Sequence, residues 1–459
     1  MKKTIKHIVK ELIENKEFKQ AKDLLSTYAP SDIAEILENV DVKDIAYIFR
    51  LVPKDKAAEV FSYLPISMET ELLTCLSDKE AVDILNEMFA DDVADVLDEM
   101  PANVVTRLLK KCDVETRQTI NKLLNYPEES AGSVMTVEFC NLKEDLTVKQ
   151  AVSQLRREID EYETINTCYV VDHERKLIGY ITMKDILLAD QEDLIGDIAR
   201  LDTVCVKTST DQEDVAKLFK KYDITVLPVV DLEERLVGII TVDDVLDIME
   251  AEASEDIEKM AAITPTDKPY LKVSVWETWK SRIPWLIILI ITSTFTSSII
   301  NGFEEKLTAV AILTAYIPML MGSGGNSGSQ AAVTIIRGLS LNEIDFKDTF
   351  KVILKELKVS IIAGITLAIA TFLKLYLLDY LILGYNFGTM AMQAMLVVSV
   401  SILFITVMAK FLGCTLPIIV KKVGLDPAVV ASPIITTIID ALGLIIYFKI
   451  AQVMLLNLL

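Results

Sequence analysis

Histidine and paired cysteine are nearly absent from this sequence. Its 459 residues include only two His and six Cys, and no two cysteines stand in a C-x-x-C pair. Zinc sites in proteins are built mainly from these two residue types, so the sequence argues against a zinc centre. The scattered cysteines are typical of free thiols in a reducing compartment.

Other absences bear on enzyme activity and export. We recognise no glycine-rich phosphate loop with a catalytic lysine and no nucleophile–base pair, so no enzyme activity is predicted. The N-terminal stretch MKKTIKHIVKELIENKEF is charged and lacks the apolar core of a signal peptide. The first half of the chain is therefore expected to stay in the cytoplasm.

Basic charge is scarce in the first 277 residues. They hold 33 Lys and Arg against 58 Asp and Glu, a net charge of −25, whereas residues 278–459 have a net charge of +4. So acidic a segment repels phosphate backbones and anionic membrane surfaces, which argues against nucleic acid as a partner. It favours multivalent cations or a basic protein instead.

Long apolar runs are confined to residues 283–459. Five runs can be separated, and each has about the 20 residues or more that a membrane-spanning helix needs. They cover about 283–301, 307–337, 350–379, 390–420 and 427–458. Lys and Arg gather before the first run, between the second and third, and between the fourth and fifth. The positive-inside rule then predicts a cytoplasmic N-terminus and a C-terminus on the outside.

One carboxylate interrupts the fifth run. Asp440 lies within ASPIITTIIDALGLIIYF, where an ionised side chain costs about 2.5–3.5 kcal/mol on insertion scales. Such a residue usually contacts a cation, a cationic partner or a wet pathway. An internally paired Asp, or one nearer the membrane surface, is the alternative. Steps of three or four residues place Thr436, Thr437 and Asp440 on one side of the helix, and that side offers oxygen ligands to a hydrated cation.

The second run has a polar, glycine-rich centre. The segment GSGGNSGSQ puts Gly324, Gly325 and Asn326 at membrane depth. Glycines there either let helices approach closely or break the helix so that carbonyls line a cavity. The amide of Asn326 adds a further oxygen.

Residues 1–130 carry a loose repeat. Segments such as APSDIAEILENV and FADDVADVLDEM begin with small, acidic or proline residues and end in Leu, Val or Met at helical spacing. The pattern predicts short helices stacked into a superhelix, and a generic helical bundle fits as well. Asp91 and Asp95 lie four residues apart and share one helix face. Either a solvated acidic face or a divalent-cation site would show this spacing.

Residues 131–250 contain an internal duplication, about 131–192 and 193–250. Each copy has a β-branched strand, a charged turn, a short strand ending in Gly-x-Ile-Thr, and a helix. The segment PVVD…LVGIITVDDVL is similar to the CBS-domain signature, and two copies in tandem form a CBS pair. The resemblance implies an α/β regulatory module. Some CBS pairs bind adenine nucleotides, which makes ATP a candidate regulator here.

The nucleotide motif of such domains is Thr-x-x-Asp. It occurs as Thr182–Asp185 and as Thr241–Asp244, and Tyr169 offers an aromatic face for a base. Ile224 stands where an aromatic residue would complete a base sandwich. The alternative is that each Thr and Asp only caps its helix.

Residues 243–282 are predicted to form an acidic connecting helix and a linker. The segment VDDVLDIMEAEASEDIEKM has eight acidic residues and a single base, Lys259. Like charges at this spacing destabilise a helix unless water, a basic surface or cations face them. Three tryptophans with Lys280 and Arg282 follow, a composition typical of the interfacial belt before a membrane span.

Together these segments predict a multidomain chain: an α-helical superhelical N-terminal domain, a tandem CBS pair of α/β fold, and a transmembrane domain of five helices over 283–459. In this order, with P-x-x-x-G-x-G-G-N in the second run, they resemble the MgtE family of Mg²⁺ channels. The resemblance implies a Mg²⁺-selective homodimer in the cell membrane, with the pore on the two-fold axis. It implies that Asp440 binds the ion in the pore and that Asn326, Gly324 and Gly325 belong to the pore motif.

The same resemblance implies cytosolic carboxylates that sense Mg²⁺ and shut the pore when the ion is plentiful. The residues at the corresponding positions are Asp91, Asp95, Glu213, Asp223, Asp243, Asp247, Glu252 and Asp256. Two other functions stay open. One is a secondary carrier for divalent cations coupled to H⁺ or Na⁺, with Asp440 as a titrating relay. The other is a membrane protein that senses nucleotide and transports nothing.

Overall fold

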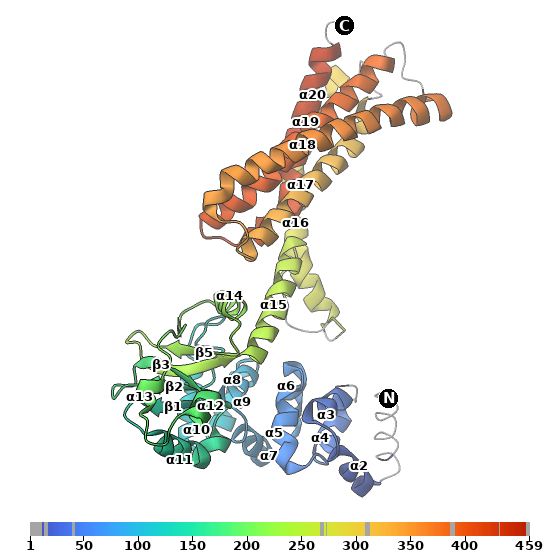
Figure 1. Cartoon of the computed structure of the whole chain (residues 1–459). Coiled ribbons are helices and arrows are strands. Elements are labelled where there is room, and N and C mark those ends of the chain that lie inside the picture. Colours follow the sequence, from blue (N-terminus) through green and yellow to red (C-terminus); the bar gives the residue numbers. More distant parts are fainter. Residues whose placement is uncertain are drawn as a thin grey trace. The chain divides into compact units, whose positions relative to one another are not determined.

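A computed structural model describes residues 12, 17–38, 42–266, 270–271, 273–307, 313–385, 391–430 and 432–455. The chain forms two compact units, Met1–Met249 and Glu250–Leu459. Figure 1 shows short helices and two small sheets in the first unit and long helices in the second. The first residues of the predicted helical-repeat segment and the last residues of the fifth apolar run lie outside the described residues.

The first unit begins with short helices of eight to ten residues. They are α2 (Phe18–Leu25), α3 (Pro30–Leu37), α4 (Val42–Phe49), α5 (Lys54–Ser62), α6 (Ile66–Cys75), α7 (Asp78–Leu85), α8 (Ala90–Asp98), α9 (Ala102–Leu109) and α10 (Val114–Leu123). Local chemistry explains several of the starts: Pro30 opens α3, Ser77 and Glu80 form a capping box on α7, and Asp113 caps α10. None of these helices is long enough to be stable alone, and they share one hydrophobic core that includes Phe61 and Leu85.

Two three-stranded sheets follow, one for each copy of the duplication. The strands are β1 (Phe139–Lys143), β2 (Thr164–Val171) and β3 (Leu177–Thr182), then β4 (Val206–Lys207), β5 (Val226–Val230) and β6 (Leu236–Thr241). In each sheet the first strand is parallel to the second, and the second is antiparallel to the third. The helices of this region are α11 (Val148–Glu158), η1 (Ile159–Glu161), α12 (Met183–Leu188), α13 (Ile195–Ile198), α14 (Gln212–Tyr222) and α15 (Val242–Met260).

The two copies exchange short backbone contacts. Thr136 of the first copy bridges Ile239 in the sheet of the second, and Arg200 at the start of the second copy bridges Tyr180 in the sheet of the first. The Gly-x-Ile-Thr glycines make these crossings possible, since a Cβ at Gly238 would lie only 2.5 Å from the sulfur of Met135. The duplicated segments therefore form one intertwined α/β pair.

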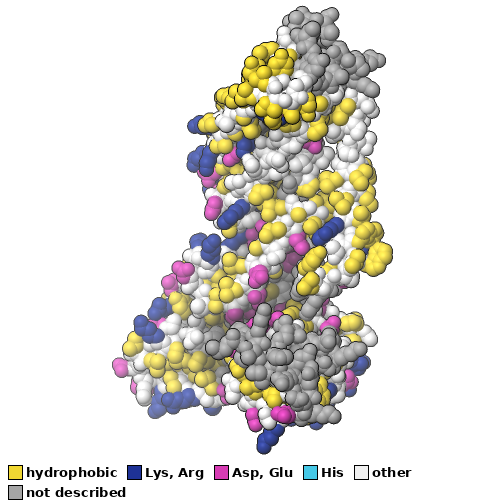
Figure 2. All heavy atoms as spheres, turned by 90° about the vertical axis from the view of Figure 1, so that its right-hand side faces the viewer, with side chains coloured by type: hydrophobic (Ala, Val, Ile, Leu, Met, Phe, Trp, Pro, Cys, Tyr) yellow, Lys and Arg dark blue, Asp and Glu magenta, His cyan; other side chains and the backbone are white. Residues whose placement is uncertain are grey.

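The second unit is built from long helices. They are α16 (Val275–Leu307), α17 (Ile317–Ser340), α18 (Thr349–Leu373), α19 (Ala391–Lys422) and α20 (Ser432–Leu455), with 3-10 turns η3 (Phe346–Asp348) and η6 (Pro427–Val430) and a π-helix η4 (Lys374–Ile382) after α18. Within the described residues, four segments are long and apolar enough to cross a membrane: Val275–Phe303, Phe346–Ile382, Ala391–Lys422 and Pro433–Leu455. Helix α17 is the fifth long helix of this unit. Its glycines, serines and side-chain amides keep its hydropathy below that of these four segments. Hydrophobic side chains cover much of the face of this unit seen in Figure 2.

Helix α16 differs from the other four in its burial. None of the residues in its most apolar stretch is buried inside this chain. Only its last turns reach the core of the unit, where the ring of Phe303 lies 4.8 Å from that of Phe448. Helices α17, α19 and α20 instead form the packed centre.

Candidate functional site

The glycines of α17 bring three helices into close contact. Helix α17 is continuous through GSGGNSGSQ, so the glycines do not break it. A Cβ at Gly324 would lie 2.7 Å from Ile405 of α19, and one at Gly325 would lie 3.1 Å from Thr436 of α20. A Cβ at Gly328 would collide with Ile439 of α20. Of the two explanations open from the sequence, close helix approach is the one found.

Asp440 lies on α20, the helix in contact with these glycines. Its side chain is partly exposed, and within the described residues no hydrogen bond or ion pair reaches its carboxylate. Its neighbours Thr436 and Thr437 each donate a hydroxyl to the carbonyl of Pro433 at 2.9 Å. Their oxygen lone pairs stay available, so one side of α20 presents acceptors only.

Asn326 lies on the exposed side of α17. It is exposed along with Gly322 and Gln330, the residues one turn before and after it, while the intervening Gly324 and Gly325 are buried. The two helices that hold the predicted pore residues are therefore packed together. Each still leaves a polar stripe uncovered by the rest of this chain.

A second carboxylate in the membrane unit, Asp379, has the opposite environment. It is 1% exposed, accepts a hydrogen bond from the Tyr316 hydroxyl at 3.0 Å and pairs with the Lys374 ammonium at 2.7 Å. Lys374 and Asp379 are five residues apart, a spacing that faces the same side only in a π-helix, which is what η4 is. Asp379 ended the third predicted run, and its partners were not recognised from the sequence. Asp379 is therefore a structural carboxylate whose charge is paired inside the protein. This is the environment that the sequence left open as the alternative for Asp440.

In the first unit, α8 carries a cluster of acidic side chains against the CBS pair. Ala90 and Ala94 of α8 pack into the core of the second copy together with Val245 and Ile248 of α15. This contact brings the carboxylates of α8 toward those at the start of α15. The Oδ1 atom of Asp91 is buried and has no hydrogen-bond partner among the residues described.

Burial and mutual repulsion raise the pKa of these carboxyls. Desolvation, with the charges of Asp92 and Asp95, raises the pKa of Glu69 to about 9. Desolvation and the charge of Asp244 raise the pKa of Asp92 to about 6 and that of Glu163 to about 7. Desolvation and the charge of Asp92 raise the pKa of Asp95 to about 7. The cluster therefore retains unfavourable negative charge at neutral pH in the absence of a cation.

Two members of this acidic cluster were not singled out from the sequence: Glu69 and Glu163. Glu69 offered a signal, because it stands in ISMETELL at a position that faces the core between Met68 and Leu72 and is only 3% exposed. An acid at an apolar position of a repeat is a reason to look for a functional group. Within the described residues, no three Asp, Glu, His or Cys side chains are already arranged to hold a metal ion.

The other predicted sensor residues lie on or just after α14 and on α15, and among them Asp243 is near enough to Asp92 of α8 for its charge to raise the pKa of Asp92. Glu213 pairs with Lys217 at 3.1 Å on α14, and Asp223, in the left-handed conformation after that helix, lines a cavity of the CBS pair. Asp243 and Asp247 are exposed on the first half of α15. Asp256 accepts a hydrogen bond from the Ser340 hydroxyl at 3.4 Å, and Glu252 lies on the same half of α15, within the second unit.

Lys259, near the end of α15, forms an ion pair with the membrane unit. Lys259 pairs with Asp426, at the connection between α19 and α20, at 2.9 Å and with Glu255 at 2.5 Å. The next residue, Met260, packs against a cluster that includes Ile435 and Ile439 of α20. The connecting helix thus packs against a cluster to which the helix that carries Asp440 contributes.

The predicted nucleotide residues act mainly as helix caps. The Thr182 hydroxyl donates to Asp185 at 2.6 Å, and Thr241 donates to Asp244 at the same distance. The Arg200 guanidinium also forms an ion pair with the Asp185 carboxylate, at 2.9 Å. These pairings are the alternative that the sequence left open, and they do not prevent a ligand from lying nearby.

A cavity of about 300 Å³ lies in the CBS pair. Its walls include Tyr169, Tyr180, Tyr222, Asp223 and Ile224. Tyr169 is buried and donates its hydroxyl to the Val226 carbonyl at 3.2 Å, so its ring is held in place as one wall. Of the five predicted nucleotide residues, this cavity includes Tyr169 alone.

Comparison with known proteins agrees with this architecture. A family model described as divalent cation transporter, MgtE, matches residues 317–450; the MgtE intracellular N domain matches 28–129 and the CBS domain 131–192 and 195–251. The magnesium transporter MgtE of Thermus thermophilus is 41% identical over 76% of this chain and 75% of its own length. This chain belongs to the MgtE family of magnesium transporters. The MgtE protein of Bacillus subtilis is 34% identical over 75% of this chain and 73% of its own length.

Two solved structures resemble the soluble part of this MgtE-family chain. The cytosolic domain of the Mg²⁺ channel MgtE in complex with ATP is 38% identical, with a TM-score of 0.50, and covers 52% of this chain and 98% of that one. The soluble part of a magnesium transporter is 29% identical, with a TM-score of 0.52, and covers 55% of this chain and 100% of that one. Together with its apolar helices, membership of this transporter family makes the chain a membrane protein.

The acidic cluster leads to a prediction about pH. In the absence of divalent cations, amide protection of α6 and α8 should fall at least about tenfold from pH 6 to pH 8, after correction for intrinsic exchange. The raised pKa of Glu69 keeps a proton on the folded chain that the unfolded chain has already lost, so stability decreases as pH rises toward about 9. Hydrogen exchange of the full chain in detergent with EDTA measures this.

Helix α7 is the internal control for this measurement. The pKa of its Glu80 is held at about 2 by hydrogen bonds from Arg50 and Ser77, so this carboxylate stays ionised over the whole range. The Glu69→Gln variant should lose most of the pH dependence in α6. If the amide protection of α6 and of α8 were the same at pH 6 as at pH 8, burial and mutual repulsion would not be raising the pKa of their carboxyls.

Proposed function

We propose that this MgtE-family protein is a Mg²⁺-selective channel for magnesium uptake, closed by cytosolic Mg²⁺. The observation that carries the proposal is Asp440: a carboxylate within a membrane-spanning helix, partly exposed and without a partner among the described residues. Asp379 shows how this fold satisfies a carboxylate that serves packing. Asp440 lacks such partners, so an ion is the partner we infer.

Ion selectivity would follow from the chemistry around Asp440. Mg²⁺ dehydrates reluctantly and is usually held through one or two carboxylates with its waters retained. The Thr436 and Thr437 oxygens and the Asn326 amide offer acceptors to those waters. Gly324 and Gly325 would set the width of the passage, since they determine how closely α17 approaches its neighbours.

The protein is proposed to act as a homodimer. Helices α17 and α20 each expose a polar stripe, and most of α16 is unburied. The described residues of this chain do not cover these surfaces. A second copy across a two-fold axis would place two Asp440 carboxylates opposite each other and bury α16. The N-terminus would be cytoplasmic and the C-terminus outside, since the basic loops lie on the N-terminal side.

Gating would use the acidic cluster of the first unit. Desolvated carboxylates around Asp91, Asp92 and Asp95 repel one another and Asp244, and a bound divalent cation would remove that repulsion. Asp243 and Asp247 lie on the same helix, α15, whose far end pairs with Asp426 before α20 and packs Met260 against a cluster to which α20 contributes. Cation binding at one end of α15 is therefore proposed to favour the closed arrangement of the pore helices at the other.

ATP is proposed as a modulator bound in the cavity of the CBS pair. The cytosolic domain of a related MgtE channel has been solved in complex with ATP. Tyr169 and Tyr180 provide aromatic walls. The carboxylate of Asp223, at the same cavity, can accept a hydrogen bond from a hydroxyl group of the nucleotide. Nucleic acid is not a proposed partner.

The second candidate, a carrier coupled to H⁺ or Na⁺, is separated from the channel by flux measurements. A channel in liposomes passes Mg²⁺ down its gradient at a rate that does not depend on a proton or sodium gradient. A requirement for either gradient would replace the channel by the carrier. No Mg²⁺ flux under any condition would favour a protein that only senses nucleotide.

Gating yields its own prediction. In the Asp91→Asn/Asp95→Asn variant, the ratio of flux at low to flux at high cytosolic-side Mg²⁺ should fall about fivefold or more, the range of coupling energies typical of allostery. The substitution removes both the ligand charges and the repulsion that Mg²⁺ would relieve. Liposome flux against Mg²⁺, with and without ATP, measures it. Asp83→Asn, which removes an exposed charge from α7, is the matched control; an unchanged ratio in the double variant would mean that the cluster does not bind the cation that closes the pore.

A further inference from the structure

A cavity of about 510 Å³ lies where the chain enters α16. It is lined by the segment that precedes the helix and by the first three turns of the helix itself. The residues are Tyr270, Leu271, Val273, Val275, Thr278, Trp279, Arg282, Ile283 and Leu286. None of them belongs to the pore, the acidic cluster or the CBS pair.

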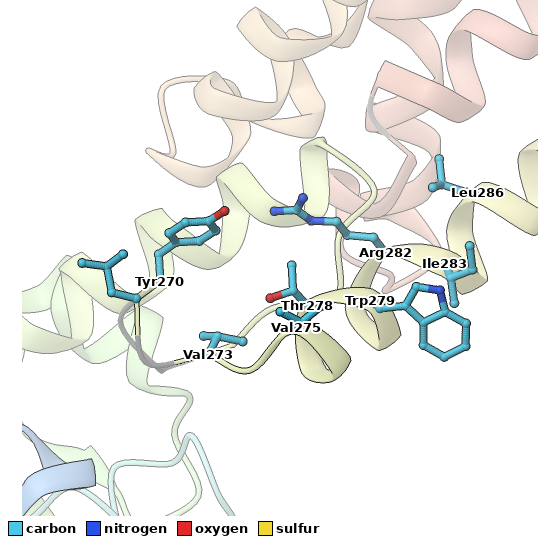
Figure 3. Close-up of a pocket in the computed structure, with 9 residues that line it drawn as sticks. Tyr270, Val273, Val275, Thr278, Trp279, Arg282, Ile283 and Leu286 are labelled. Carbon is cyan, nitrogen blue, oxygen red and sulfur yellow. The ribbon is translucent and has the colours of Figure 1, made fainter.

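Arg282 is the single charged residue among these lining residues. Figure 3 shows its guanidinium and the Tyr270 hydroxyl pointing toward one another across the open space. Within the described residues, Arg282 has no ion pair and the Tyr270 hydroxyl has no hydrogen bond. Two donors therefore face the cavity, whose other polar lining groups are the Trp279 indole N–H and the Thr278 hydroxyl, which already donates to the Ser274 carbonyl at 3.1 Å.

The cavity lies at the level of the membrane surface. Helix α16 is a membrane-spanning segment from Val275 onward, and its first turns carry Trp276 and Trp279, which are 72% and 50% exposed. Exposed tryptophans at the end of a span mark the headgroup layer. Ile283 and Leu286 are one and two turns further along the helix, toward the hydrocarbon.

We propose that this cavity binds an anionic phospholipid. The guanidinium of Arg282 would bind the phosphate, the Tyr270 hydroxyl would donate a further hydrogen bond, and an acyl chain would lie along Ile283 and Leu286. An anionic headgroup is favoured over a choline or ethanolamine one because no carboxylate is found among the described residues that line the cavity, so none of them pairs with an ammonium. The nearest acid along the helix, Glu277, caps α16 by accepting from the Ser274 amide at 2.9 Å.

The chain supplies its own reporter for this site. All three of its tryptophans lie between positions 276 and 285, so tryptophan fluorescence reports on this part of the chain alone. The full-length protein is reconstituted in phosphatidylcholine vesicles containing phosphatidylglycerol, with bromine on the acyl chains of one lipid or the other. Bromine quenches a tryptophan that it contacts. In 1 M NaCl, where the Debye length is about 3 Å, general attraction to an anionic surface is suppressed and a bound lipid remains.

Quenching by brominated phosphatidylglycerol should exceed quenching by brominated phosphatidylcholine at equal mole fraction, with a preference of about fivefold. Arg282→Gln should bring the preference close to one. Lys280→Gln removes the same charge two residues earlier from a side chain that does not line the cavity, and it should leave the preference unchanged.

Three results would overturn the proposal. The first is equal quenching by both lipids in the wild type, which is also what a second copy covering the cavity would give. The second is a preference that survives Arg282→Gln. The third is a preference abolished by inorganic phosphate at millimolar concentration, because the site would then bind free phosphate. The measurement involves no ion flux, so its outcome is independent of the transport proposal.

Discussion

Asp440→Asn should reduce Mg²⁺ flux about a hundredfold or more while the protein remains folded and keeps the oligomeric state of the wild type. The attraction between one carboxylate and a divalent ion at about 4.5 Å, one water layer away, is about 2 kcal/mol even at the dielectric constant of water. Two copies facing one passage would double it. Asparagine keeps the size and the oxygen of the side chain, so the loss would report the charge. Liposome uptake together with size-exclusion chromatography measures both parts of the prediction.

Asp348→Asn is the control for this variant. Asp348 is another carboxylate of the membrane unit, but it lies at the start of α18 and pairs with Lys351 at 2.8 Å. Its neutralisation should leave flux within about twofold, as expected for an exposed ion pair. Wild-type flux in Asp440→Asn would remove Asp440 from the pore and leave it as a surface carboxylate.

The fold was predictable where the sequence pattern has a single structural solution. The Gly-x-Ile-Thr motif occurs twice, and only a residue without a Cβ fits beside Met135 at Gly238. Apolar runs of sufficient length indicated the membrane helices without reference to their packing. A helical period marked the short helices of the first unit, because each must bury one face.

The candidate site was predictable only in part, because sequence spacing shows the neighbours along one helix and not across helices. Asp91 and Asp95 were visible as a pair at helical spacing, whereas Glu69 and Glu163 join them through tertiary packing. The Asp379 ion pair required η4 to be a π-helix, and nothing in KLYLLDYLI distinguishes that geometry from an α-helix. The cavity beside Arg282 depends on the position of Tyr270 and Leu271 next to α16, which no periodicity encodes.

The largest effect on stability is expected from Gly413→Ala on α19. A Cβ there would collide with the backbone carbonyl oxygen of Gly328 on α17, and a backbone cannot move aside as a side chain can. Overpacking of this kind costs about 1–3 kcal/mol or more. The apparent melting temperature of the detergent-solubilised protein should fall by about 5 °C or more, and Mg²⁺ flux should fall with it because α17 carries the proposed pore motif.

Two glycines on α17 extend this prediction to a series of three variants. Gly324→Ala would meet side chains only, those of Ile405 at 2.7 Å and Ile439 at 3.1 Å, and should lower the melting temperature less than Gly413→Ala. Gly322→Ala meets nothing within 4 Å and should be neutral or slightly stabilising, since alanine is the better helix former by about 1 kcal/mol. The expected order follows the atom that each new methyl group would strike. If Gly413→Ala melted at the wild-type temperature, α17 and α19 would not be in backbone contact, and the explanation of the glycine-rich motif as a close-packing surface would fail.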